Sequence, residues 1–421
     1  MEELKEGWRR VKLLDYYEVT NGLSKNKSEF GFGYPFLTFK EVFNNYFLTE
    51  NLVNLANSTV KEREKCSIKI GDIFITRTSE TMEELGITAV ALKDYPNATF
   101  NGFTKRLRPK SHAEISPEFI SFYLKSKEFR NQIQSFSSLT TRASLNNEML
   151  EKLELIIPDI HKQKEIAKIL KNLYDKIEIN NEMNKTFEEM AQTLFKRWFI
   201  DFDFPNENGE PYRSSGGKMV DSELGEIPEG WMIKNLGSIC ETTSGGTPSR
   251  KKEEYYLNGH IHWIKSKELN GHFIIDTEEK ITDNALKESS AKLLPKNTIL
   301  IAMYGATVGE VGITPMIASC NQAICAIKEN EKIPYFFIYE YFKENKEKVK
   351  NLAIGSAQQN ISQILIKNLK IIVPIRQIME NYVEVTKNLY DKILQNQLEI
   401  QSLTQIRDTL LPKLMSGEVE V

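Results

Sequence analysis

The chain has 421 residues, of which 40 % are hydrophobic and 27 % are charged, and its formal net charge is −3. This length predicts two or three domains, and the apolar content is sufficient for packed cores. A net charge near zero excludes a protein coated in positive charge, so any nucleic-acid site has to be local or shared with a partner. The charged first residues are unlike a signal peptide, and no window is apolar enough for a membrane span. Four cysteines form no disulfide framework in a chain this long, and they favour a reducing cytoplasm.

The first half opens at residues 7–13 with a turn, a tryptophan anchor and a short strand. Residues 70–77 follow as a turn that leads into a β-branched strand. Residues 117–136 carry the pattern of one amphipathic helix, and residues 139–144 form a polar turn. From Pro158 to about Asp203 the chain contains neither glycine nor a further proline, which predicts a long helix.

The second half repeats this order of elements. Residues 172–177 recur letter for letter as residues 388–393, which lie 216 positions further on, and the Gly-Trp start recurs at residues 230–231. The strand and the closing helix recur at residues 295–301 and 334–349. Between the halves, residues 205–225 are polar and rich in helix breakers, which indicates a linker. The chain is therefore interpreted as a tandem duplication with a long helix closing each half.

The apolar residues of the first long helix fall on alternating steps of four and three, which is the seam of a helix that packs along another helix. Its seam members are Ile166, Leu170, Leu173, Ile177, Phe187, Ala191 and Leu194. The second copy is the expected partner, and antiparallel pairing gives the chain approximate two-fold symmetry. Asn180 and Asn396 occupy equivalent positions on the two seams. A polar residue in such a seam commonly fixes the register of the pair.

No motif in the sequence indicates catalysis. The glycine spacing at residues 30–33 does not match a cofactor loop, and residues 244–249 lack the lysine of a phosphate-binding loop, so we interpret them as a flexible loop. No two prolines are adjacent, which excludes the Pro-Pro-aromatic motif of DNA amino-methyltransferases. His260, His262 and His272 lack ligands at a metal-site spacing, so no metal is expected.

These features predict an α+β fold of two similar mixed α/β globular domains separated by two long antiparallel coiled-coil helices, related by an internal tandem duplication with pseudo-two-fold symmetry. The expected boundaries are residues 1–157 for the first domain, 158–204 for the first long helix, 205–225 for the linker, 226–373 for the second domain, 374–415 for the second long helix and 416–421 for the tail. Between Asn21 and Lys65 the first domain has no recognisable counterpart in the second half. Divergent domains on a shared frame suit the reading of two different half-sites.

The duplicated Gly-Trp start, residues 299–309, residues 358–362 and the C-terminal residues 411–418 together carry a resemblance over essentially the full length of the chain. The chain resembles the specificity subunit of Type I restriction–modification enzymes. The resemblance implies a non-catalytic DNA-recognition subunit whose two target-recognition domains each read one part of a bipartite sequence. It also implies that the helices set the spacer.

The resemblance further implies partners. DNA methyltransferase subunits, two in number, are expected to dock on the helices and to bring S-adenosylmethionine. Separate restriction and translocase subunits bring ATP and Mg²⁺, and this chain itself binds no cofactor. The competing hypothesis from the residues is a coiled-coil adaptor whose two heads bind protein partners, which the near-neutral charge favours.

Lysine suits phosphate contacts, whereas arginine and amide side chains can pair with base edges. In the first domain the candidates come from a polar loop, a strand end, a basic cluster and a turn. In the second they follow the Gly-Gly loop and Trp263, or lie on turns at strand ends. The predicted DNA-binding residues are Lys25, Lys27, Arg77, Lys105, Arg106, Arg108, Arg142, Arg250, Lys251, Lys252, Lys265, Lys267, Tyr304, Gln358 and Gln359.

Overall fold

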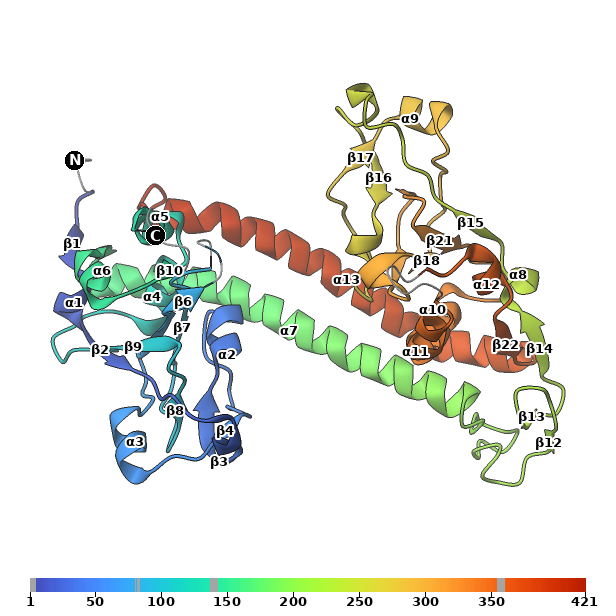
Figure 1. The fold of residues 1–421 in the computed structure, drawn as a ribbon, viewed down its shortest axis with the longest axis horizontal. Helices are drawn as coiled ribbons and strands as arrows, with labels where there is room; N and C mark the ends of the chain where they lie inside the picture. Colours follow the sequence, from blue (N-terminus) through green and yellow to red (C-terminus); the bar gives the residue numbers. More distant parts are fainter. Residues whose placement is uncertain (1–4, 80, 82–83, 137–142, 354–359) are drawn as a thin grey trace. The chain divides into compact units, whose positions relative to one another are not determined.

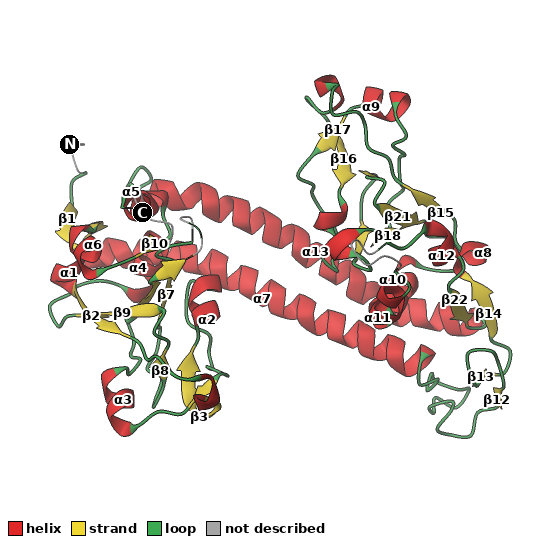
Figure 2. Ribbon diagram, viewed as in Figure 1, coloured by secondary structure: helices red, strands yellow, loops and turns green. Residues whose placement is uncertain are grey.

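The computed structural model describes residues 5–79, 81, 84–136, 143–353 and 360–421. The chain forms two compact units, Met1–Ile177 with Ser402–Val421 and Glu178–Gln401. The boundaries between the units fall inside the two long helices, so each unit contains a part of both (Figure 1). Each unit combines short strands with helices (Figure 2), which confirms the predicted α+β class.

The first head, residues 5–157, is built on a four-stranded antiparallel sheet in the order β2-β9-β5-β7. In a second sheet, β3 pairs antiparallel with β4 and parallel with β8. Strand β1 pairs antiparallel with β11, which joins the start of the head to its end. The strands are β1 (Trp8–Lys12), β2 (Tyr17–Asn21), β3 (Phe30–Leu37), β4 (Leu55–Ala56), β5 (Ile73–Thr76), β6 (Thr78–Ser79), β7 (Thr88–Val90), β8 (Thr99–Phe100), β9 (Thr104–Pro109), β10 (Ala143–Ser144) and β11 (Glu154–Pro158).

The second head, residues 226–373, has the same sheet plan. Its four-stranded antiparallel sheet runs β15-β21-β18-β19, and β16 pairs antiparallel with β17 and parallel with β20. Strand β14 pairs with β22 as β1 pairs with β11. The strands are β14 (Met232–Asn235), β15 (Thr242–Ser244), β16 (Ile261–Ile264), β17 (Lys280–Ile281), β18 (Thr298–Ala302), β19 (Val311–Thr314), β20 (Ser319–Cys320), β21 (Ile324–Ile327) and β22 (Lys370–Val373).

Short helices connect and cover these strands. Each expected closing helix is in fact two helices, so the prediction of a single helix over residues 117–136 and over 334–349 was wrong. In the first head the Ser126 hydroxyl accepts from Phe129 N–H and starts a new helix. The helices are α1 (Leu13–Tyr16), η1 (Lys27–Glu29), α2 (Phe39–Asn44), α3 (Val60–Lys65), α4 (Pro117–Tyr123), α5 (Lys127–Ser135), α6 (Asn147–Lys152), α8 (Leu236–Ile239), η2 (Glu253–Tyr255), η3 (Ser266–Glu268), α9 (Asp283–Glu288), η4 (Gly305–Thr307), α10 (Tyr335–Glu344), α11 (Lys346–Asn351) and α12 (Gln363–Lys367).

The segment between Asn21 and Lys65 does have a counterpart, which corrects the expectation from the sequence. Its strands β3 and β4 correspond to β16 and β17. Both pairs are antiparallel, and the longer strand of each pair also pairs parallel with a short strand, β3 with β8 and β16 with β20. After β4, Thr59 caps α3, and after β17, Thr282 caps α9. A threonine hydroxyl that accepts a backbone N–H of the first turn starts both helices. The topology is shared although the sequence is not.

The breaker-rich segment 205–225 is packed rather than free. The Tyr212 ring stacks on Phe204 at 4.6 Å between centroids, and Phe204 stacks on Trp231 at 5.1 Å. Strand β12 (Met219–Val220) pairs with β13 (Ile227–Pro228). The segment therefore packs against Phe204, which in turn stacks on the tryptophan that begins the second head.

The long helices are α7 (Ile160–Phe199) and α13 (Arg376–Met415), of 40 residues each. In the first unit, Ile166 and Leu170 of α7 share a buried cluster with Leu411 and Leu414 of α13. In the second unit, Phe195 and Phe199 of α7 pack against Tyr382 of α13. The predicted helical seam is confirmed, with the two helices antiparallel within each unit. Among the described residues, no helix has the length and apolarity that crossing a membrane requires.

A buried carboxylate lies where α10 meets α13 in the second unit. Glu340 is 1 % exposed and accepts a hydrogen bond from the Tyr390 hydroxyl, while its Oε2 has no partner among the described residues. Burial raises the pKa of Glu340 above its usual 4.5. The protonated form is therefore favoured in the folded state.

Replacing Glu340 with glutamine should flatten the pH dependence of stability. Because the folded pKa is raised, the contribution of Glu340 is fully present below about pH 4.5 and is lost as the pH rises through the folded value. The E340Q variant should lose less unfolding free energy than the wild type between pH 5 and pH 8, measured by urea unfolding. E344Q, at an exposed position of α10, is the matched control and should follow the wild type. Equal slopes for E340Q and the wild type would contradict the assignment.

Candidate nucleic-acid interface

The two heads share a corner at the end of the central strand. In the first head, Arg77 N–H donates to the carbonyl of Phe103 at 2.8 Å, and its own carbonyl accepts from Leu145 N–H at 2.8 Å. In the second head, Met303 makes the same two bonds, with Ala323 at 2.8 Å and with Ile361 at 2.9 Å. The residues that follow are paired in both heads, Thr78 with Ser144 and Tyr304 with Asn360. The predicted residues Arg77 and Tyr304 are thus brought to equivalent corners.

An asparagine fixes the turn beside each corner. Asn101 Oδ1 accepts from Phe103 N–H at 2.9 Å, and Asn321 Oδ1 accepts from Ala323 N–H at 3.2 Å. The backbone N–H of each asparagine donates to the carbonyl of the last residue of a strand, Asn101 to Leu37 of β3 and Asn321 to Ile264 of β16. Sequence reasoning missed these two asparagines, although an asparagine that bonds two residues ahead is a known turn signal. They position the residues of the corner.

In each head, the loop after the first strand of the four-stranded sheet, β2 or β15, packs against this turn. A Cβ on Gly22 would lie 2.0 Å from the Asn101 carbonyl oxygen, and one on Gly245 would lie 2.2 Å from the Cys320 carbonyl oxygen. Only glycine allows such an approach of two backbones. The segment at residues 244–249, expected to be a flexible loop, is therefore packed at its glycines.

The predicted arginines of strand β9 face inward. Arg106 is 6 % exposed, and its guanidinium donates to the Ser67 carbonyl at 2.6 Å and to the Thr20 hydroxyl at 3.0 Å. Arg108 makes a two-point ion pair with the buried Asp72, at 2.7 and 2.6 Å. These guanidinium groups satisfy acceptors within the head, so their first role is structural.

Two predicted lysines of the first head are also engaged within it. Lys25 makes ion pairs with Glu29 at 3.3 Å and with Glu62 at 2.8 Å. Lys105 donates to Asn147 Oδ1 at 2.5 Å, and burial lowers its pKa, with a further contribution from Arg77. By contrast, Lys27 and Arg77 are exposed, and Phe103, beside Arg77, is 64 % exposed.

In the second head most predicted cations lie at the surface and are paired with carboxylates. Lys265 and Lys267 both approach Glu278, at 2.6 and 2.8 Å. Arg250 and Lys252 have carboxylate partners of their own. Lys251 is exposed between them. Three further predicted residues, Arg142, Gln358 and Gln359, lie outside the described residues.

Asn180 and Asn396 are both buried in the helical seam of the second unit. Asn180 Nδ2 donates to Glu399 Oε2 at 2.8 Å, and Asn396 Nδ2 donates to Asn184 Oδ1 at 2.9 Å. Asn184 in turn donates to the Ile393 carbonyl at 3.3 Å. These bonds connect α7 to α13 at defined positions.

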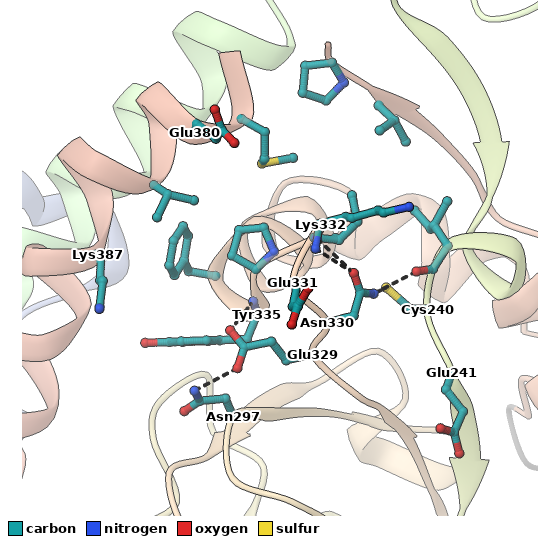
Figure 3. A pocket seen from close by; sticks show the side chains of 18 of the residues that line it. Cys240, Glu241, Asn297, Glu329, Asn330, Glu331, Lys332, Tyr335, Glu380 and Lys387 are labelled. Carbon is teal, nitrogen blue, oxygen red and sulfur yellow. Dashed lines mark hydrogen bonds between the residues drawn. The ribbon is translucent and has the colours of Figure 1, made fainter. Parts of the chain in front are cut away.

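A groove of about 1780 Å³ runs between the second head and the first turns of α13 (Figure 3). Its wall before α10 is held by Asn330, which donates to the Ile239 carbonyl at 2.8 Å, and by Glu329, which accepts from Asn297 at 2.8 Å. Glu380 and Lys387 of α13 line the other side. The groove is larger than the usual 300–1,000 Å³ of a small-molecule site.

The described residues hold no cluster of three or more histidine, cysteine, aspartate or glutamate side chains that could bind a metal. The three histidines singled out above each approach an acidic side chain: His260 approaches Asp283, His262 approaches Asp276, and His272 approaches Glu188. The cysteines are buried and unpaired. Two equivalent heads with exposed cations, on paired helices, define a recognition scaffold.

Known proteins share this scaffold. Residues 5–189 and 228–405 match the model of the Type I restriction modification DNA specificity domain. The chain is 29 % identical to the MjaIX specificity subunit of Methanocaldococcus jannaschii, covering 100 % of this chain and 95 % of that one. It is 28 % identical to the HindI specificity subunit of Haemophilus influenzae, covering 96 % and 100 %. The S subunit structure from M. genitalium aligns over 98 % of this chain and 97 % of that one, with a TM-score of 0.60 at 18 % identity.

The chain belongs to the Type I restriction–modification specificity family. It is the DNA specificity subunit of such a system, the non-catalytic part of the enzyme complex. This family membership decides against the adaptor hypothesis.

Replacing Arg108 with alanine should destabilise the first unit. The substitution leaves the Asp72 carboxylate, which is completely buried, without its ion-pair partner. Loss of one member of a buried pair typically lowers the unfolding free energy by about 3 kcal/mol or more. Urea unfolding measures the effect, with R77A as the exposed control. A stable R108A variant with altered DNA sequence preference would show instead that Arg108 reads DNA.

Proposed function

We propose that each head reads one half of a bipartite double-stranded DNA sequence through its corner and the loops beside it. The observation that carries this proposal is the shared plan of the two heads combined with different side chains at equivalent positions. Arg77 and Phe103 are exposed at the corner of the first head, whereas the equivalent Met303 is buried and Ala323 is half-buried in the second. A common frame with different side chains suits two different base sequences.

Within this proposal the cations divide into two groups. Lys27, Lys251, Lys252, Lys265 and Lys267 contact phosphates, which position the duplex without reading its sequence. Arg77 and Arg250 are the candidates for base edges, because a guanidinium can bond a guanine at two points. Lys25, Lys105, Arg106 and Arg108 act from inside the first head by holding the strands that carry the exposed residues.

The long helices set the distance between the half-sites. Each helix of 40 residues is about 60 Å long at 1.5 Å per residue. Successive major grooves on one face of DNA are roughly 34 Å apart, so helices of this length suit two half-sites. Asn180 and Asn396 fix the register of the helices by their buried hydrogen bonds.

DNA methyltransferase subunits, two in number, dock on this helical frame in the cytoplasm. They bring S-adenosylmethionine, while restriction subunits bring ATP and Mg²⁺, and this chain binds no cofactor. The groove beside α13 is a suitable docking surface in the second unit. It combines apolar residues such as Val383 and Leu394 with charged ones such as Lys387, as protein interfaces do.

Replacing residues 226–373 with the same region of a related subunit should change one half of the methylated sequence and leave the other half unchanged. The two heads have separate sheets and lie in different compact units, so the exchange leaves the first head intact. Sequencing that detects methylated bases in cells carrying the hybrid system gives the answer. A change in both halves would contradict independent reading.

Reversing the charge of Lys387 should weaken assembly with the methyltransferase subunit. Lys387 is exposed and lines the groove, so K387E changes the groove without disturbing the core. The measurement is the amount of methyltransferase that co-purifies with the chain. K392E, on the same helix but outside the groove, is the matched control. Equal co-purification of both variants would remove the groove from the interface.

A further inference from the structure

The cations at the surface of the second head share a small set of carboxylates. Arg250 makes a two-point bond with Glu279, at 3.1 and 2.7 Å. Lys265 lies 2.6 Å from Glu278 and 3.7 Å from Glu279, and Lys267 lies 2.8 Å from Glu278. Arg250 from one loop and Lys265 and Lys267 from another thus pair with two adjacent carboxylates.

These carboxylates are held in place by the backbone around them. Glu278 N–H donates to Glu268 Oε1 at 2.8 Å, and Lys265 N–H donates to the other oxygen of Glu268 at 2.7 Å. The Thr277 hydroxyl donates to the Glu279 carbonyl at 2.8 Å. The two nearby lysines lower the pKa of Glu278 to about 2, so this carboxylate stays ionised at neutral pH.

A third carboxylate, Glu288, follows the same arrangement. Lys252 lies 2.7 Å from Glu288 at the end of α9, and the Tyr255 hydroxyl donates to the same carboxylate at 2.6 Å. Lys252 therefore has a partner from a different element, as Arg250 has.

Most of these side chains are exposed, which makes their pairs exchangeable, although the side chain of Lys265 is only 16 % exposed. The side chains of Glu278 and Lys267 are 53 % and 60 % exposed. Ion pairs of this kind contribute little to folding because water and salt screen them. Arg250 keeps a second support, since its guanidinium lies 4.4 Å from the Tyr256 ring centre and 5.2 Å from that of Trp263. The arginine therefore stays positioned when its carboxylate partner leaves.

We infer that Glu278, Glu279 and Glu288 act as intramolecular counter-ions, which occupy the DNA-contacting cations of the second head until DNA displaces them. The inference rests on the proposed function, because it needs those cations to contact DNA. Electrostatic contacts supply nearly all of the affinity for DNA that lacks the target sequence. An internal competitor for the cations therefore lowers that affinity, and base contacts at the target sequence restore binding there.

The test compares the double variant Glu278→Gln, Glu279→Gln with Glu310→Gln. Glu310 pairs with Lys346 at 2.6 Å elsewhere in the second head, so E310Q controls for the removal of one paired carboxylate at another position. Each complete chain is assembled with its methyltransferase subunit, and binding is measured at several salt concentrations. The probes are two duplexes of equal length, one with the mapped methylation site and one without it.

The double variant should bind the duplex without the site several-fold more tightly at low salt. Its plot of log affinity against log salt should steepen by about one to two units, because each freed cation that meets a phosphate adds about 0.9. E310Q should leave the slope unchanged. A double variant with the slope of E310Q, or with weakened binding, would overturn the inference.

The variant Lys265→Ala, Lys267→Ala separates this inference from the proposed function. If the lysine variant binds both duplexes with wild-type affinity and slope, these lysines do not contact DNA, and the proposed footprint fails at this loop. If the lysine variant weakens binding while the glutamine variant behaves as E310Q does, only the counter-ion role fails. Thermal unfolding checks that every variant is folded.

Discussion

The packing of each long helix into two cores is the constraint on which the rest of the structure depends. The boundary between the units lies inside both helices, so neither core is complete without residues that are distant in sequence. In the first unit, the chain after α13 returns to the first tryptophan, and a Cβ on Gly417 would lie 2.9 Å from Trp8 Nε1. In the second unit, Phe199 at the end of α7 lies 5.9 Å from the Trp231 ring. Each tryptophan that starts a head is therefore covered by the end of a helix.

This arrangement explains why the sequence repeat was visible in the helices and invisible in much of the heads. A seam residue such as Leu170 or Tyr382 meets buried neighbours, so its type is restricted by packing. The strands β3 and β16 share their pairing, which uses backbone groups that every residue supplies, but they bury different side chains, Phe36 and Leu37 in β3 and Trp263 and Ile264 in β16. The counterpart of residues 21–65 is therefore recognisable from the strand topology and not from the amino-acid sequence.

The sequence predicts which residues are candidates for the site, but it does not predict the direction in which their side chains point. Arg106 and Arg108 alternate along β9, so the sequence places them on one face of a strand. It does not show that Thr20, Ser67 and Asp72 cover that face, because those acceptors come from other elements. The inward direction of the arginines therefore depends on which segments meet in space. The division of the closing helix at Ser126 is different, because its capping bond to Phe129 N–H is local and a serine N-cap can be read from the sequence.

The two heads pair their cations in different surroundings. In the first head, Arg106 and Arg108 are surrounded by fixed acceptors, and their charges are part of the fold. In the second head, Lys265 and Lys267 meet a carboxylate at the surface, where water and phosphate compete with it. Breaking a buried pair is costly, whereas exchanging an exposed one is not. We therefore expect salt-dependent contacts with DNA to come more from the second head than from the first.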